Sequence, residues 1–155
     1  MTIVHLHLLA NHFPILGSIF VTALFLVALV LRNPLIQKIS LWFLVFIALT
    51  TAVAYFSGDQ SVNAVRGLAD ISQPMIEQHA SAARTELILM FFTGVVALGS
   101  ALFYLKRPKF PIVVLATVLI LLLANSAFSI YVGFLGGQIH HPEIRSLIET
   151  SLVWM

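Results

Sequence analysis

Six histidines are the residues of this chain whose type and spacing can bind a metal ion or a haem. Three of them, His5, His7 and His12, fall in the opening run HLHLLANHFP. His79 precedes a long apolar segment, and the pair His140–His141 follows another. A neutral imidazole can ligate haem iron or an ion of zinc, copper or iron, and carboxylates nearby can complete the shell or orient the rings.

The chain that carries these histidines is strongly apolar. It has 155 residues, of which 60% are hydrophobic and 9% are charged, and this balance excludes an ordinary soluble domain. Four uncharged stretches are long enough to cross about 30 Å of hydrocarbon as helices. We predict one all-α integral membrane domain over residues 1–155, an antiparallel four-helix bundle with helices at 4–31, 36–57, 73–105 and 110–135. The first stretch lacks the flanks of a cleaved signal peptide, so we expect it in the mature protein.

The charged residues predict how the chain crosses the membrane. The two short loops contain five basic residues and no acid: Arg32, Lys38, Lys106, Arg107 and Lys109. The opposite side holds both termini, a long connection, three arginines and every acidic residue. The positive-inside rule therefore predicts a multi-pass protein of the bacterial inner membrane with both termini in the periplasm. All six histidines then share the outer face.

A proline and a helix cap shape the approaches to the first and third helices. Pro14 has no amide hydrogen, so we expect the chain to kink there or to begin its membrane helix near His12. Ser72 is a suitable N-cap with a proline just after it, which predicts a third helix that begins outside the bilayer. This extension carries His79, and Glu86 follows seven residues later on the same face.

The end of the chain has its own signals. Gly136 and Gly137 are expected to stop the fourth helix, because glycine permits the left-handed backbone of a helix C-terminus. After Pro142, one apolar stripe predicts a short helix on the membrane surface with Trp154 at the interface. The stripe consists of Ile144, Leu147, Ile148 and Leu152.

A haem held by two histidines needs them on different helices, with an apolar slot between the rings and cations for the propionates. His12, His79 and His141 come from three segments, and we predict that two of them are the axial ligands of a haem b. His7 is a further candidate for cofactor binding. The expected propionate partners are Arg84 and Arg145. The expected lining of the slot is Phe13, Leu16 and Phe134.

A bare Cu, Zn or Fe ion is the alternative cofactor. Such a site needs three or more histidine or carboxylate ligands close together. The chain has no cysteine, which excludes disulfides, thiolate sites and iron–sulfur clusters. The candidate ligands combine imidazoles and carboxylates: His5, His7, His12, His79, His141, Glu77, Glu86 and Glu143.

Several other functions are disfavoured. No nucleophile elbow, phosphate loop, zinc-protease pair or pair of catalytic carboxylates occurs, so an enzyme is not indicated. No charged residue lies at mid-membrane, where a pump or an ion channel usually needs one. The basic residues lie in short loops, so nucleic acid is not an expected partner. We expect the lipid bilayer and a periplasmic or membrane redox protein as partners, and a homo-oligomer is left open.

Three segments carry a resemblance: HLHLLANHFPILG, SGDQSVNAVRGLADISQPMIEQHASAA and YVGFLGGQIHHPEIR. Together they resemble small bacterial four-helix membrane proteins related to the family called domain of unknown function 2231. The resemblance implies recurring histidines at His7, His12, His79 and His141, an acid at Glu143, and a haem-binding or redox role. The chain departs from the group at His140, where relatives tend to have arginine, and it lacks the His-Pro that many members of the wider family carry near the start.

Three function hypotheses follow. The leading one is a membrane cytochrome of b type that transfers electrons through a haem at the periplasmic face. The second is a non-haem metal-binding membrane protein, which the acids beside the histidines would favour. The third is a structural subunit of a larger membrane complex, which predicts a colourless and metal-free protein that copurifies with other subunits.

Overall fold

The computed structural model describes residues 2–66, 68, 71–141 and 143–144, and its regular structure is entirely helical there. The helices are α1 (Ile3–Ala10), α2 (His12–Val30), α3 (Pro34–Val65), α4 (Gln73–Phe103) and α5 (Ile112–His140). Because α1 and α2 follow one another along one line, the chain has four helical segments, each long and apolar enough to cross a membrane. The prediction of four apolar helices is therefore confirmed.

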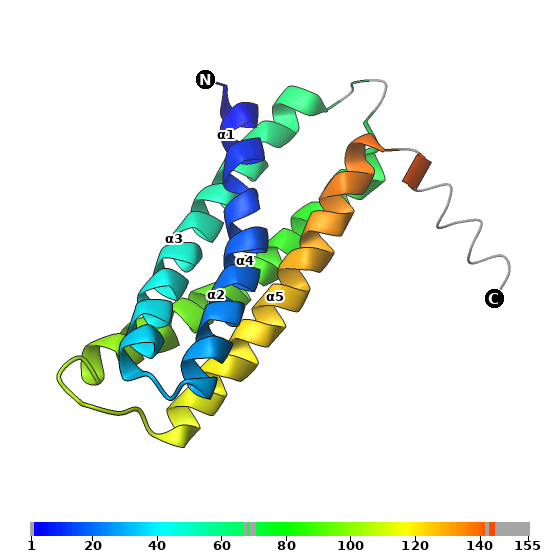
Figure 1. Ribbon diagram of the computed structural model, residues 1–155. Helices are drawn as coiled ribbons and strands as arrows, with labels where there is room; N and C mark the ends of the chain where they lie inside the picture. Colours follow the sequence, from blue (N-terminus) through cyan, green and yellow to red (C-terminus); the bar gives the residue numbers. More distant parts are fainter. Residues whose placement is uncertain (1, 67, 69–70, 142, 145–155) are drawn as a thin grey trace, which may run out of the picture.

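The four segments lie side by side (Figure 1). Helix α2 packs against α3 and α5, α4 also packs against α3 and α5, and α1 packs mainly on α3. The start of α1, the start of α4 and the end of α5 lie at one end of the molecule, which we call the histidine end. The α2–α3 and α4–α5 connections lie at the opposite end, which we call the loop end.

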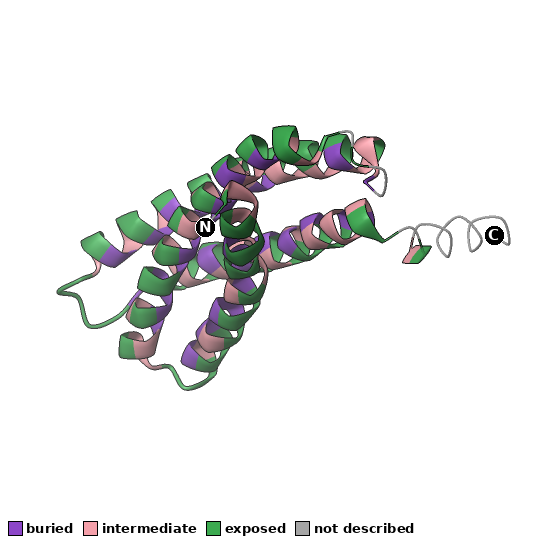
Figure 2. Ribbon diagram, turned by 90° about the horizontal axis from the view of Figure 1, so that it is seen from above, coloured by how far each residue is buried: buried purple, intermediate pink, exposed green. Residues whose placement is uncertain are grey.

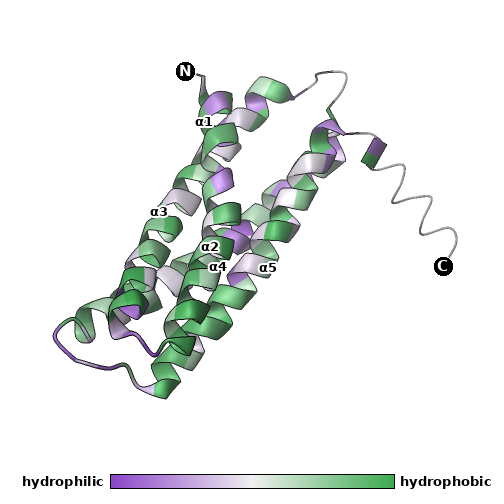
Figure 3. Ribbon diagram, in the orientation of Figure 1, coloured by the Kyte–Doolittle hydropathy of each residue, from purple (hydrophilic) through white to green (hydrophobic). Residues whose placement is uncertain are grey.

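Burial and hydropathy follow the expected pattern. Viewed from above, each helix turns its buried face toward the other helices and its exposed face outward (Figure 2). The outward faces are mostly hydrophobic along the helices, and hydrophilic residues concentrate in the connections and at the helix ends (Figure 3). Toward the loop end the interior is closely packed and apolar, with fully buried Phe25, Leu44, Met90 and Leu122 in one cluster.

The α2–α3 connection is a tight turn that its residue types explain. Arg32 adopts the left-handed conformation with φ of 49°. Asn33 caps α3, because its Oδ1 accepts hydrogen bonds from the amides of Leu35 at 3.0 Å and Ile36 at 3.3 Å. Pro34 occupies the first helical turn, where a missing amide hydrogen is harmless.

Two predicted helix ends differ from the structure. Helix α3 continues to Val65 instead of ending near residue 57, and within it the hydroxyls of Ser57 and Ser61 bond to carbonyls of the preceding turn, so these polar side chains are satisfied inside the helix. The expectation that Gly136 and Gly137 stop the last helix is wrong, since α5 runs through both glycines to His140.

Other expectations concern the helix starts and the C-terminal stripe. The helix is interrupted for one residue at Asn11, whose backbone stays right-handed, and α2 starts at His12, as expected from Pro14. Helix α4 begins directly after Ser72, although the Ser72 side chain makes no capping hydrogen bond. The predicted C-terminal surface helix lies outside the described residues apart from Glu143 and Ile144.

Candidate functional site: a histidine pair

Two histidines from different helices meet at the histidine end. His7 on α1 and His79 on α4 have ring centroids 6.4 Å apart, with ring planes inclined at 74°. Both residues are half-buried. The sequence marked each of them as a cofactor-binding candidate, but the predicted axial ligands were two of His12, His79 and His141, with His7 only a further candidate. We call these two residues the histidine pair.

His7 is held against α3 by a carbonyl and a glycine. Its Nδ1 donates a hydrogen bond to the backbone oxygen of Ala54 at 2.9 Å. One helical turn further along α3, a Cβ atom on Gly58 would lie only 2.7 Å from His7 Cε1. The imidazole therefore reaches the carbonyl because residue 58 has no side chain.

His79 is held against α5 in the same way. Its Nδ1 donates to the backbone oxygen of Val132 at 3.0 Å. A Cβ atom on Gly136, one turn further along α5, would lie 3.1 Å from His79 Cε1. This contact also explains why a glycine stands inside α5: it receives the imidazole ring and does not end the helix.

The two hydrogen bonds determine which nitrogen of each ring carries the hydrogen. A backbone carbonyl can only accept, so Nδ1 must carry the hydrogen in each histidine. In the neutral imidazole the second nitrogen, Nε2, then has a free lone pair. A metal-ligating histidine commonly donates its other N–H to a carbonyl, which sets the tautomer and the ring orientation. Both rings are therefore prepared to act as ligands through Nε2.

The two supports are an internal repeat. We call α1, α2 and α3 the first hairpin, and α4 and α5 the second hairpin. The helix that returns to the histidine end carries the pattern Phe-x-Gly-x-Gln in each, at residues 56–60 and 134–138. In each case the carbonyl that accepts from the histidine lies four residues before the glycine. This repeat was the sequence signal for the pair, and reasoning from histidine positions alone missed it.

The other histidines make different contacts. His12 is exposed and its Nδ1 donates to the Leu8 carbonyl of the preceding turn at 2.8 Å. His5 Nδ1 lies 2.6 Å from the hydroxyl of Thr2. His141 is exposed and pairs through Nδ1 with Glu143 at 2.7 Å. Within the described ranges, no hydrogen bond, ion pair or ring contact joins His12 or His141 to His79.

The predicted carboxylates and cations are dispersed. Glu77 and Arg84 are exposed on α4, while Arg145 lies outside the described residues. Glu86 is 4% exposed and accepts a hydrogen bond from Ser129 on α5. Among the residues described by the structure, no three histidine or acidic side chains lie close enough together to hold a metal ion.

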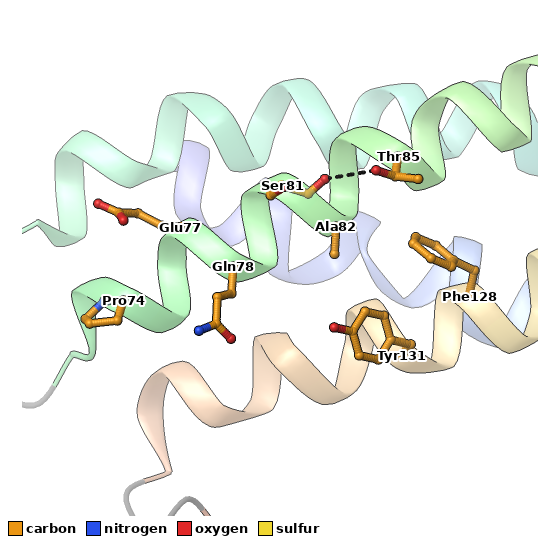
Figure 4. A pocket seen from close by; sticks show the side chains of 8 residues that line it. All are labelled: Pro74, Glu77, Gln78, Ser81, Ala82, Thr85, Phe128 and Tyr131. Atoms are coloured by element: carbon orange, nitrogen blue, oxygen red, sulfur yellow. Dashed lines mark hydrogen bonds between the residues drawn. The ribbon is translucent and has the colours of Figure 1, made fainter.

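The predicted lining of a haem slot does not surround the pair. Phe13, Leu16 and Phe134 are 43%, 61% and 50% exposed, so they face outward, as expected for lipid-facing residues. A shallow groove of about 590 Å³ lies between α4 and α5, where Gln78 and Tyr131 extend into the space between the helices (Figure 4). Neither member of the histidine pair lines it.

Comparison with protein-family models, with curated proteins and with solved structures found no match to this chain.

Proposed function

We propose that the protein is a membrane cytochrome of b type whose haem iron is bound by His7 and His79. The observation that carries this proposal is the pair itself: two imidazoles from separate hairpins, each with Nδ1 bonded to a carbonyl and a ring 6.4 Å from its partner. The resemblance to the proteins related to domain of unknown function 2231 agrees with it.

The separation of the rings suits a metal centre between them. A metal bound by two imidazole nitrogens at about 2.0 Å each places the ring centroids about 6 Å apart, since each centroid lies about 1 Å behind its nitrogen. The 6.4 Å between the two ring centroids is close to this separation.

The number of protein ligands favours haem over a bare ion. Zinc and iron ions bound by protein alone need three or more side-chain ligands, and in the described part of the chain the pair has no third histidine or acid beside it. A haem supplies four nitrogens of its own and needs only two axial ligands. When bound, the haem would supply a one-electron redox centre, and the chain would contribute the ring tautomers, their orientation and a half-buried environment.

Helix lengths agree with a haem near the outer membrane face. His7 precedes the end of α2 by 23 residues and His79 precedes the end of α4 by 24. At 1.5 Å per residue both lie about 35 Å from the loop end, just beyond about 30 Å of hydrocarbon. With the basic loop end in the cytoplasm and both termini in the periplasm, the haem could exchange electrons with a partner at the periplasmic surface.

The test is the visible spectrum of the detergent-purified protein, expressed with ample haem. We expect a sharp α band in the dithionite-reduced minus oxidised spectrum, from haem with two histidine ligands. The same preparation should contain about one iron per chain by elemental analysis. A colourless protein that contains copper would assign the pair to a two-coordinate metal ion. A colourless, metal-free protein would favour a structural subunit of a larger complex. Either of these two colourless outcomes would contradict the cytochrome proposal.

A further inference from the structure

A polar cluster lies inside the packed helices, toward the loop end from the histidine pair. Its five side chains come from α2, α4 and α5 and are at most 4% exposed, although they are polar. We call them the interior cluster: Ser18, Glu86, Thr93, Asn125 and Ser129.

The hydrogen bonds of this cluster link α4 to α5. Ser129 Oγ donates to Glu86 Oε1. Asn125, one turn toward the loop end, donates through Nδ2 to Thr93 Oγ1 at 2.7 Å. Because Glu86 and Thr93 are seven residues apart on α4, and Asn125 and Ser129 four apart on α5, the four side chains form one column.

Ser18 of α2 lies one turn from Thr22, whose hydroxyl bonds to Ser126 of α5 at 2.9 Å, and this register brings Ser18 to the level of Ser129. Two buried oxygens among the five side chains have no hydrogen-bond partner. They are Oγ of Ser18 and Oδ1 of Asn125, and both residues are 0% exposed. Buried polar atoms in proteins are nearly always bonded, if not to protein then to ordered water. The surroundings are polar enough to give a water the two to four partners that it needs. The interior cluster therefore has unused capacity to bind water.

Glu86 has no counter-charge. In the described ranges no basic side chain forms an ion pair with it, and its bonded partner is the neutral Ser129. An ionised carboxylate in such surroundings is strongly disfavoured, so a buried acid of this kind holds a proton or a bound cation. His79 stands seven residues before Glu86 on the same face of α4 and meets His7 of α1, while Arg84, two residues before Glu86, is exposed. Tyr55 on α3 is level with the pair, and Tyr131 on α5 lines the outer groove.

The first hairpin has no acid at the position that matches Glu86. Seven residues after the histidine, the first hairpin has Pro14 where the second hairpin has Glu86. The first hairpin has Thr51 three residues before Ala54, whose carbonyl accepts from His7. The Thr51 hydroxyl donates to the carbonyl of Ile47 in its own helix at 2.8 Å. The matching residue in the second hairpin is Ser129, which donates to Glu86 of another helix.

We infer that the interior cluster is a proton-binding site: Glu86 holds one proton, beside water held at Ser18 and Asn125. On the face of α4 that carries both His79 and Glu86, Ala82 and Ala83 stand between them, so no further titratable side chain of that face separates the two. This inference does not depend on what the histidine pair binds.

Infrared spectroscopy of the purified protein in lipid tests the inference without any cofactor. We expect the C=O stretching band of a protonated carboxylic acid at neutral pH, with a shift when H₂O is replaced by D₂O. Glu86→Gln should remove that band, whereas Glu77→Gln, which changes an exposed acid of the same helix, should leave it.

Ser129→Ala provides a second variant that keeps the carboxyl group. It should move the Glu86 band to higher frequency without removing it, because the carbonyl loses its hydrogen bond. Circular dichroism and the midpoint of thermal unfolding establish that each variant is folded. Absence of the band in the wild-type protein, its persistence in Glu86→Gln, or its replacement by a carboxylate band on addition of sodium chloride would each overturn the proton-binding assignment. The last result would indicate a cation site instead.

Discussion

The two hairpins share their histidine supports and differ in the residues below them. In both, a histidine donates to a carbonyl of the returning helix of its own hairpin, beside a glycine. Toward the loop end from that level, the first hairpin has a one-residue interruption of the helix at Asn11 and the apolar Pro14, whereas the second has the uninterrupted α4 and the buried Glu86. If the histidine pair binds a cofactor as proposed, the shared residues are those that this binding requires. The residues that differ are then free to serve another task.

If the hairpins contribute equal ligands, removing either one should have the same large effect. His7→Ala and His79→Ala should each abolish haem retention, because one remaining imidazole cannot supply both axial ligands. His12→Ala and His141→Ala serve as controls and should retain haem, since both side chains make local bonds at exposed positions. The measurement is the haem content per chain of each purified variant. Full haem content in His7→Ala would contradict the assignment of His7 and His79 as the two haem ligands.

Replacing Gly58 and Gly136 with alanine should show how much each glycine contributes to haem binding. Gly58→Ala places a Cβ 2.7 Å from His7 Cε1, and Gly136→Ala places one 3.1 Å from His79 Cε1. Both should weaken haem binding, Gly58→Ala by tenfold or more and Gly136→Ala by less, because the first overlap is the more severe.

Gly137→Ala is the matched control for both substitutions. A Cβ at this position meets no atom within 4 Å, so haem affinity should be unchanged. The measurement is the dissociation constant from haem titration into the apoprotein. Equal losses in Gly136→Ala and Gly137→Ala would show that helix propensity, and not the fit of the ring, governs binding.

The contact between hairpins can be tested away from the histidines. A Cβ on Gly94 of α4 would lie 2.7 Å from the Cβ of Ala48 on α3, an atom that cannot rotate away. Gly94→Ala should lower the free energy of unfolding by about 1–3 kcal/mol. Gly99→Ala, on the same helix with no atom within 4 Å, should be neutral or slightly stabilising. Denaturant unfolding in detergent measures both, and equal stabilities would contradict close α3–α4 packing.

A smaller effect is expected at the loop end. Lys38 of the first hairpin donates through Nζ to the carbonyls of Leu105 at 2.9 Å and Arg107 at 3.0 Å, which belong to the connection of the second. Lys38→Met should cost about 0.5–1 kcal/mol, since these bonds are charge-assisted but exposed to solvent. Lys109→Met is a control for the loss of positive charge in the same region. Equal unfolding midpoints for both variants would show that the two bonds contribute no stability.

The helices were predictable because apolar length is a strong signal in sequence. Their ends were harder, since a glycine inside a helix and a glycine that ends one look alike until the packing partner is known. Gly136 illustrates this: it follows an apolar run as a helix stop would, but the His79 ring occupies the space beside it.

The sequence predicted that histidines would form the candidate site, but it did not predict which two of them would meet. The concentration of histidines at one end was evident, and His79 was among the predicted ligands. His12 was preferred to His7, but in the structure the ring of His7 packs on α3, whereas His12 is exposed and bonds to a carbonyl of the preceding turn. The burial of Glu86 was missed because the apolar stretch begins one residue later, so the sequence alone placed the acid at its edge.

The location of each glycine support has a consequence for the order of assembly. Each histidine is supported by the returning helix of its own hairpin, so the first hairpin can complete its half of the site while the ribosome is still synthesising the second. The partner ring arrives only after α4 has been made, and the contacts that hold it only with α5, which follows α4 in the chain. A cofactor that requires both rings therefore binds only after α5 has been made, and its retention would report that this stage of biogenesis has been passed.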